Sequence, residues 1–164
     1  MKFLTKLTFI IVFISRQGFS ADIQYFLSPY FFKNPQSYSV NGNQSIKYNL
    51  GELLSTAIEQ TNNNFFPCQS DQISDAVINI YPTTFYNPAT NHLQTDAKIR
   101  IYSLKNSNIE ELLVQERKVM RLSANSEEII LEHYKLLSYK INLKLSDMLL
   151  ETDIKMNGEI CKSF

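Results

Sequence analysis

Glycine, histidine and cysteine are scarce in this chain, and tryptophan is missing. Among 164 residues there are four glycines, two histidines and two cysteines. So few glycines leave no loop that could cradle a phosphate and no G-x-S-x-G nucleophile elbow. Two lone cysteines also lack the usual four-ligand grouping of a zinc site. These shortages weigh against a nucleotide-phosphate loop, a serine hydrolase and a structural metal.

The two histidines complete no known pattern. We place His92 in a loop and His133 at the border of a long helix, beside its apolar stripe. A zinc pair at helical spacing would need a second histidine four residues from His133, but isoleucine and leucine stand there. We therefore predict no catalytic residue, no metal and no cofactor.

Neither sign of charge dominates, with 16 Lys and Arg against 16 Asp and Glu. Nucleic acid is not an expected partner, because its binding needs a clustered basic surface. The adjacent glutamates at 110–111 and 127–128 fit a solvated turn and a helix start better than a glycosidase cleft. The sequence therefore predicts that the protein is not an enzyme.

Long apolar runs are also missing, apart from a short one near the start. Two lysines precede Leu7–Ile14, and a polar stretch with small residues at 18 and 20 follows. This layout predicts a secretory signal peptide over 1–20, cleaved after Ser20. The alternative is a short anchor that stays uncleaved. Cleavage would remove three basic groups and no acid, leaving 13 basic and 16 acidic groups, a net charge of −3.

The remainder, residues 21–164, has the length of one domain with a core of its own. Export places it in an oxidising compartment, where disulfides persist. With two cysteines, the one possible intramolecular bridge is Cys68–Cys161. It would close a loop of roughly 90 residues and fix the C-terminal tail to the body. The alternative is two unpaired thiols.

The first half of the chain predicts one strand and one helix. The apolar run Ile23–Leu27 is a first strand, and the aromatic segment 28–44 is expected to cross the body in an extended form. A helix follows from Leu50, with apolar residues at helical spacing and Asn49 as its cap. The asparagines at 62–64 and Pro67 end it.

The second half predicts three strands and a long helix. The strands cover Ala76–Tyr86, with Pro82 at an edge or bend, then 96–104, and Leu112–Leu122 after a turn at 105–108. Asn125 can cap the last helix. Its apolar stripe steps by three and four residues, and consists of Ile130, Tyr134, Leu137, Ile141, Leu145 and Met148. A helix lying on a sheet explains this stripe, whereas Lys144 interrupts the heptad of a coiled coil.

The element order is therefore β-α-β-β-β-α. Such an order predicts an α+β fold, a two-layer sandwich in which two helices cover one face of an antiparallel or mixed sheet of about four strands. Both helices would share a face, so the loop after the first and the tail after the second can meet at the bridge.

Aromatic residues are the one compositional feature that favours binding. The chain has nine tyrosines and 11 phenylalanines, many of them clustered. Most should fill the core, and the rest could line a groove for a lipid or a partner protein. The candidates for contact are Tyr30, Phe31, Phe32, Phe85 and Tyr86.

Three stretches carry a resemblance to a known family. IQYFLSP is similar to the Y-x-L opening strand of the auxiliary components of bacterial lipid-transporting ABC systems, whose substrate-binding subunits carry the MCE domain. DAVINIYPTTFYNPATNHLQTDAKIRIYSL resembles their strand-bend-strand, and RKVMRLSANSEEIILEHYKLLSYKINLKLSDML their closing strand and long helix. The lipopolysaccharide-assembly lipoprotein resembles the same architecture. Members are typically lipoproteins, but no cysteine follows the apolar run here.

The resemblance implies a non-enzymatic periplasmic accessory protein that docks on an envelope lipid-transport or assembly complex and binds protein or lipid. A secreted interaction module, adhesin-like or host-directed, is the alternative from another class. In that case the aromatic loops would be the contact surface, and the protein would be found in the culture medium. A small hydrolase without a recognisable motif, with His92 as the residue to test, is the third.

Overall fold

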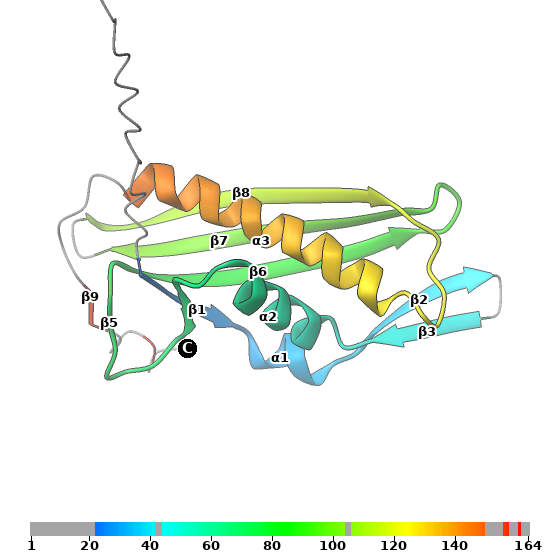
Figure 1. Cartoon of the computed structure of the whole chain (residues 1–164), viewed down its shortest axis with the longest axis horizontal. Coiled ribbons are helices and arrows are strands. Elements are labelled where there is room, and N and C mark those ends of the chain that lie inside the picture. Colours follow the sequence, from blue (N-terminus) through cyan, green and yellow to red (C-terminus); the bar gives the residue numbers. More distant parts are fainter. Residues whose placement is uncertain (1–21, 42–43, 104–105, 150–155, 158–160, 162–164) are drawn as a thin grey trace, which may run out of the picture.

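The computed structural model describes residues 22–41, 44–103, 106–149, 156–157 and 161 (Figure 1). The predicted signal peptide and its cleavage site lie outside these residues. In chain order the elements are β1 (Ile23–Leu27), α1 (Pro29–Lys33), β2 (Gln36–Asn41), β3 (Gln44–Tyr48), α2 (Leu50–Thr61), β4 (Phe65–Pro67), β5 (Ile73–Ser74), β6 (Ala76–Asn87), β7 (His92–Ser103), β8 (Asn106–Val119), α3 (Glu127–Leu149) and β9 (Met156–Asn157).

A mixed five-stranded sheet organises the molecule, in the order β4-β1-β6-β7-β8. The first strand of the chain is not an edge strand: β1 pairs in parallel with β4 on one side and with β6 on the other. The long strands β6, β7 and β8 form an antiparallel meander. Two small two-stranded sheets, β2-β3 and β5-β9, lie outside it.

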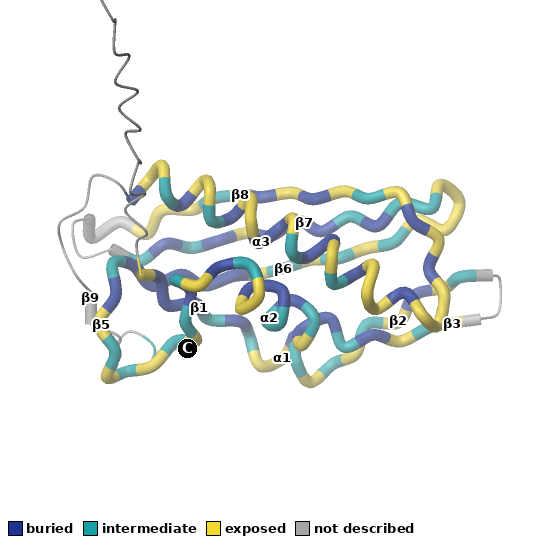
Figure 2. Tube along the Cα trace, in the orientation of Figure 1, coloured by how far each residue is buried: buried dark blue, intermediate teal, exposed yellow. Residues whose placement is uncertain are grey.

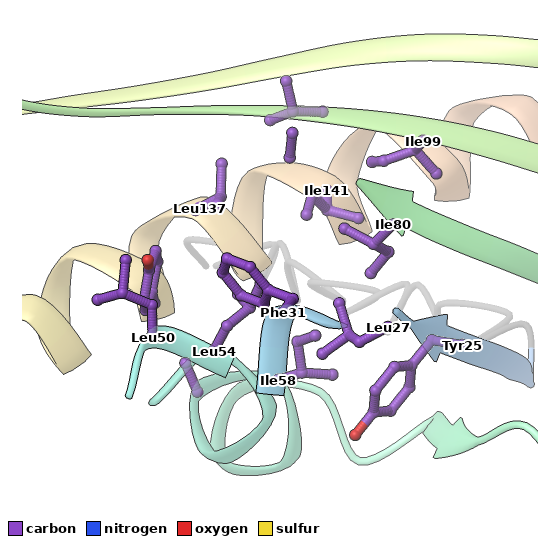
Figure 3. Packing of buried hydrophobic residues seen from close by; sticks show 14 of the residues in the cluster. Tyr25, Leu27, Phe31, Leu50, Leu54, Ile58, Ile80, Ile99, Leu137 and Ile141 are labelled. Carbon is purple, nitrogen blue, oxygen red and sulfur yellow. The ribbon is translucent and has the colours of Figure 1, made fainter. Parts of the chain in front are cut away.

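The helices pack against one face of this sheet, which we call the helix face (Figure 1). The alternation predicted for β7 is confirmed, because Ala97, Ile99 and Ile101 are buried toward the helices. Figure 3 shows the centre of the core, where Leu137 and Ile141 of α3 point toward strands and helices that surround them. The coarse prediction of an α+β fold with helices on a sheet therefore holds, whereas the predicted numbers of strands and helices are wrong.

The segment predicted to be extended is instead α1 followed by the β2-β3 hairpin. Ser28 accepts a hydrogen bond from the backbone N–H of Tyr30, and Pro29 occupies the first helical position, where its missing N–H costs nothing. In the hairpin, the core side chain Tyr38 donates its hydroxyl to the Thr84 carbonyl at 3.2 Å. This segment is rich in aromatic residues. Its helix and its hairpin are each too short for a repeating apolar pattern to be recognised in the sequence.

Helix α2 begins where the sequence predicts. Asn49 accepts a hydrogen bond from the N–H of Glu52 and caps it. Gly51 lets α1 approach closely, because a Cβ at this position would lie 2.8 Å from the Cα of Phe32 and 2.9 Å from the carbonyl oxygen of Phe31. Glycine is therefore required here by the packing of one helix start against another.

Helix α3 begins two residues after the predicted cap. The carbonyl of Ser126, rather than that of Asn125, accepts the first helical bond, from the N–H of Ile130. The predicted stripe is buried from Ile130 to Leu145, but its last member, Met148, is exposed and Leu149 is buried instead. At the end of a helix the sheet no longer covers the full width of the stripe.

Pro82 lies within β6, which is a central strand over only part of its length. Strand β1 pairs with β6 as far as Ile80, while β7 pairs along all of it. Pro82 therefore lies where β6 has one neighbouring strand of the main sheet, which satisfies the predicted edge position.

Candidate binding surface

The face of the sheet opposite the helix face, which we call the far face, is covered at one end and open to solvent at the other. The disulfide lies at the covered end. Cys68 and Cys161 are bonded, with their Cα atoms 5.6 Å apart, as the sequence predicts. Beside them the buried side chain of Gln24 accepts from the N–H of Gln69 at 2.8 Å and donates to the carbonyl of Gln72 at 2.9 Å. The short sheet β5-β9 lies at this same end (Figure 1). The disulfide and the loop that follows Cys68 therefore lie at the end of the far face where Val77 and Asn79 are buried.

The other end of the far face is open to solvent. Its positions are the odd-numbered residues of β6 and β8 and the even-numbered residues of β7, by the registers of the three strands. Charged side chains pair across β7 and β8: Glu111 meets Lys98 at 2.7 Å and Arg100 at 2.9 Å. Among these polar groups stand large apolar side chains with substantial exposure, namely Tyr81, Phe85, Ile109, Leu113 and Val119.

Helix α3 carries a second apolar stripe, on the side away from the core. Figure 2 shows the alternation of buried and exposed residues along this helix. The exposed apolar residues recur at helical spacing and are Ile129, Leu136, Tyr139 and Leu143. A helix that served only to cover a sheet would place polar residues at these positions. We call these four residues the outer stripe.

The edge strand β8 joins these two surfaces. A groove of about 400 Å³ runs between β8 and α3. It is lined by Leu113 of the far face, by Leu143 of the outer stripe, and by Val114, Gln115, Lys140 and Lys144. Apolar side chains from two surfaces and two ammonium groups therefore converge on one edge of the sheet.

The two lysines donate hydrogen bonds to backbone carbonyls of that edge. Lys144 Nζ donates to the carbonyl of Leu113 at 3.1 Å, and Lys140 Nζ donates to the carbonyl of Gln115 at 3.4 Å. Lys140 Nζ also lies 2.6 Å from Glu116 Oε2, in an ion pair rather than a well-directed hydrogen bond. Sequence analysis missed this site; the available signal was the recurrence of Leu136, Tyr139 and Leu143 on the polar side of the helix.

The five aromatic residues predicted to contact a ligand or partner do not gather in one place. Tyr30 is 73% exposed on α1, whereas its neighbour Phe31 is buried in the core and Phe32 packs partly against that core. Phe85 is 46% exposed on the far face. Tyr86 lies on the helix face, where its hydroxyl donates to Asn91 Oδ1 at 2.9 Å. Of the five, only Phe85 lies on the same face as Leu113.

His133 is a core residue, not the helix-border residue predicted. Its Nε2 atom lies 3.0 Å from the hydroxyl of Thr95, which in turn bonds with Thr84, and Thr84 bonds with the hydroxyl of Tyr134. Burial lowers the pKa of His133 to about 4, so the ring is neutral at ordinary pH. Thr95, His133 and Tyr134 of this chain of bonds are buried, and Thr84 is half-buried.

Two further properties bear on the class of protein. Within the described ranges, histidine, cysteine and acidic side chains form no cluster of three or more that could hold a metal ion. In the same part of the chain, no helix combines the length and the apolar character needed to cross a membrane.

Comparison with known proteins identifies no family. Neither a protein family nor a curated protein matches the sequence. Among solved structures, an uncharacterized protein is similar with a TM-score of 0.48 and 11% identity, over 75% of this chain and 89% of that chain. A minor lipoprotein from Acinetobacter baumannii is similar with a TM-score of 0.40 and 11% identity, over 76% and 91%. At these values the likenesses assign no role, and the resemblance to the ABC-transport auxiliary components stays a prediction.

Proposed function

We propose that this chain is a non-enzymatic accessory protein of the cell envelope, which acts by binding a component of a lipid-transport or envelope-assembly complex. The observation that carries the proposal is the convergence of exposed apolar side chains on the β8 edge. Leu113 and Leu143 approach this groove from two different surfaces and are each about half exposed. Apolar patches rimmed by polar groups are typical of sites that bind other molecules.

Two features support the envelope as the compartment. The N-terminal segment has the layout of a secretory signal. The disulfide between Cys68 and Cys161 is a bond that oxidising compartments preserve and the cytosol reduces. A protein held together in this way is suited to work outside the cytoplasm.

The buried polar groups support binding rather than catalysis. A general base must reach the proton it removes within hydrogen-bond distance. His133 is fully buried and bonded to Thr95, so that substrate cannot reach it without unfolding. The partly exposed His92 opens β7, next to Asn87 and Val119 in the sheet, and neither of these neighbours carries a carboxylate.

Site-specific photo-crosslinking in the native organism tests the proposal. A photoreactive amino acid at position 113 or 143 should capture an envelope protein or lipid, because both side chains line the groove. The same amino acid at Gln60, an exposed residue of α2 far along the chain from the groove, is the matched control. Capture only from positions 113 and 143, in the envelope fraction, is the expected result.

Recovery of the protein from the culture medium, without an envelope crosslink, would contradict the proposal and favour the secreted interaction module. Equal capture from position 60 would show that the crosslinks are not specific to the groove.

A further inference from the structure

Strand β8 presents backbone hydrogen-bonding groups on its outer edge. It is the last strand of the five-stranded sheet, and among the described residues it pairs with β7 alone. In an antiparallel ladder, the N–H and C=O of one residue point to the same side of the strand. The carbonyls of Leu113 and Gln115 accept from lysines of α3, so the N–H groups of these two residues also point outward. An unpaired edge of this kind is a template for a further strand.

The lysines that hold this edge can exchange partners. Lys144 makes no ion pair within the described part of the chain, and its ammonium group has only the neutral carbonyl of Leu113 as acceptor. An ammonium group is attracted more strongly to a carboxylate than to a neutral carbonyl, because both partners are then charged. An acidic segment beside β8 could take the ammonium groups while its own N–H groups bonded with the carbonyls. No backbone group would then lose its partner. Lys144 gives up no ion pair in this exchange, whereas Lys140 must stay close to Glu116 Oε2, so Lys144 is the main contact for an acidic residue.

We propose that the β8 edge is a docking site for an extended acidic segment of a partner protein, which adds to the sheet as a sixth strand. This inference rests on the proposed binding function and specifies its partner. The two lysines reach carbonyls of residues two apart, so the segment should carry acidic residues at alternate positions, on the helix face. The residue between them lies on the far face beside Leu113 and should be apolar.

A second copy of the chain fits this edge poorly. Lys140 contacts Gln115 and Lys144 contacts Leu113, so α3 crosses β8 with its residue numbers running in the opposite direction. Antiparallel pairing of two copies about Val114 would bring Lys140 and Lys144 of both copies together around the twofold axis. Like charges placed opposite each other destabilise strand pairing. A lipid fits the apolar groove but cannot satisfy the outward N–H groups.

Peptide binding to the mature, disulfide-bonded protein tests the proposal. The probe is a short fluorescein-labelled peptide that alternates Glu and Val, and its counterpart alternates Lys and Val. Fluorescence anisotropy should show binding of the acidic peptide and not of the basic one, more strongly at low ionic strength. Amide hydrogen exchange should slow at residues 113 and 115 when the acidic peptide is bound.

Two variants locate the site. Lys144→Gln should weaken binding of the acidic peptide at least about fivefold, because a charge-assisted bond is lost. Gln115→Pro removes an outward N–H without touching the ladder to β7, and should abolish binding while the far-ultraviolet circular dichroism spectrum is unchanged. Lys135→Gln is the control, since Lys135 pairs with Glu132 on the same helix and, within the described residues, donates no hydrogen bond to β8.

One combination of results would contradict the docking of an acidic segment. If the peptide does not bind, and Lys140→Gln or Lys144→Gln makes the protein dimerise, the lysines only guard the edge against strand addition, and the inference is overturned. Crosslinking from position 143 that persists in that case would leave the proposed function standing with another kind of partner. If the peptide does not bind and position 143 captures no partner, both the inference and the proposed function are contradicted.

Discussion

At the scale of single residues, the core contains an unusual run of polar side chains beneath α3. Tyr134, Thr84, Thr95 and His133 bond in sequence at 2.9 to 3.0 Å. Each group in such a chain satisfies its neighbour, which is what makes its burial tolerable. The run ends at His133 Nδ1, which is buried and has no hydrogen-bond partner in the described part of the chain. Protonation at that atom would place a charge in the core.

This arrangement predicts a histidine-dependent loss of stability in acid. The folded pKa of His133, about 4, lies below the ordinary value of 6.5, so between these values the unfolded chain binds more protons. The stabilising effect of the neutral ring is complete above pH 6.5 and falls by about 1.4 kcal/mol per pH unit as the pH drops toward 4. Glu116 opposes this shift of the pKa, and Lys118 and Lys140 add to it, but burial is the largest cause.

Urea unfolding between pH 7 and 4.5 measures the effect. The stability of the unaltered protein should fall by on the order of 2 kcal/mol relative to His133→Gln, which has no imidazole to titrate at this position. The comparison with His133→Gln cancels any pH dependence that the two proteins share. Parallel curves for His133→Gln and the unaltered protein would contradict the assignment.

The sequence does not predict the burial of His133, because helical periodicity locates only the centre of a buried stripe. The width of the stripe depends on how far the sheet wraps around the helix. His133 lies beside the predicted stripe but bonds with Thr95 of β7 and is close enough to Glu116 and Lys118 of β8 for them to affect its pKa, so the sheet extends past the stripe at this point. At the C-terminal end of the helix the opposite holds, and Met148 is exposed although the periodicity places it in the core.

At the scale of elements, α3 provides a matched pair of substitutions. Both Leu145 and Met148 belong to the apolar stripe that the sequence predicts, but Leu145 is fully buried and Met148 is 37% exposed. Leu145→Ala should cost about 2–5 kcal/mol of unfolding free energy, because it removes buried surface and leaves a cavity. Met148→Ala should cost less than about 1 kcal/mol. Denaturant midpoints measure both, and equal losses would show that the end of α3 is packed more closely than described.

The elements that the sequence predicted correctly are those long enough to repeat their apolar pattern several times. The helix from Leu50 and the alternation along β7 each repeat one pattern several times. Helix α1 has five residues and strand β2 has six, so neither repeats its pattern often enough to be recognised. Their contacts lie far along the chain, as when Tyr38 of β2 bonds with the carbonyl of Thr84. Such elements are fixed by tertiary packing and not by local sequence.

At the scale of the whole molecule, the disulfide is the main covalent constraint. The bond joins residues separated by 93 positions. Restricting so large a loop in the unfolded chain stabilises the fold by about 4–5 kcal/mol in the chain-entropy description. Cys161→Ser should therefore lower the unfolding free energy by roughly that amount.

Denaturant unfolding with and without a reducing agent checks this value. The reducing agent should destabilise the unaltered protein to the level of Cys161→Ser and have no effect on the double variant Cys68→Ser, Cys161→Ser. An unchanged midpoint after reduction would show that the tail contributes little to the fold.

The sequence also predicted the layers of the molecule but not the order of its strands. Apolar patterns predict which residues face inward, and the meander of β6, β7 and β8 follows from short connections. Nothing in Ile23–Leu27 shows that this strand has parallel neighbours on both sides, because pairing partners leave no local pattern. The mixed sheet is therefore a property of the assembled chain.

The central place of β1 constrains when this protein can fold. Both neighbours of β1, β4 and β6, come later in the chain, separated from it by α1, a hairpin and α2. Folding is slow when long loops must close, at a cost in chain entropy, before any stabilising contact has formed. A chain made from its N-terminus therefore lacks the first partner of β1 until Phe65–Pro67 has appeared, lacks the second until Ile80 has appeared, and cannot form the disulfide until Cys161 has. Its topology delays the disulfide-bonded native state until Cys161 has been made, and until then we expect the chain to remain open enough to bind chaperones or to pass through a narrow pore.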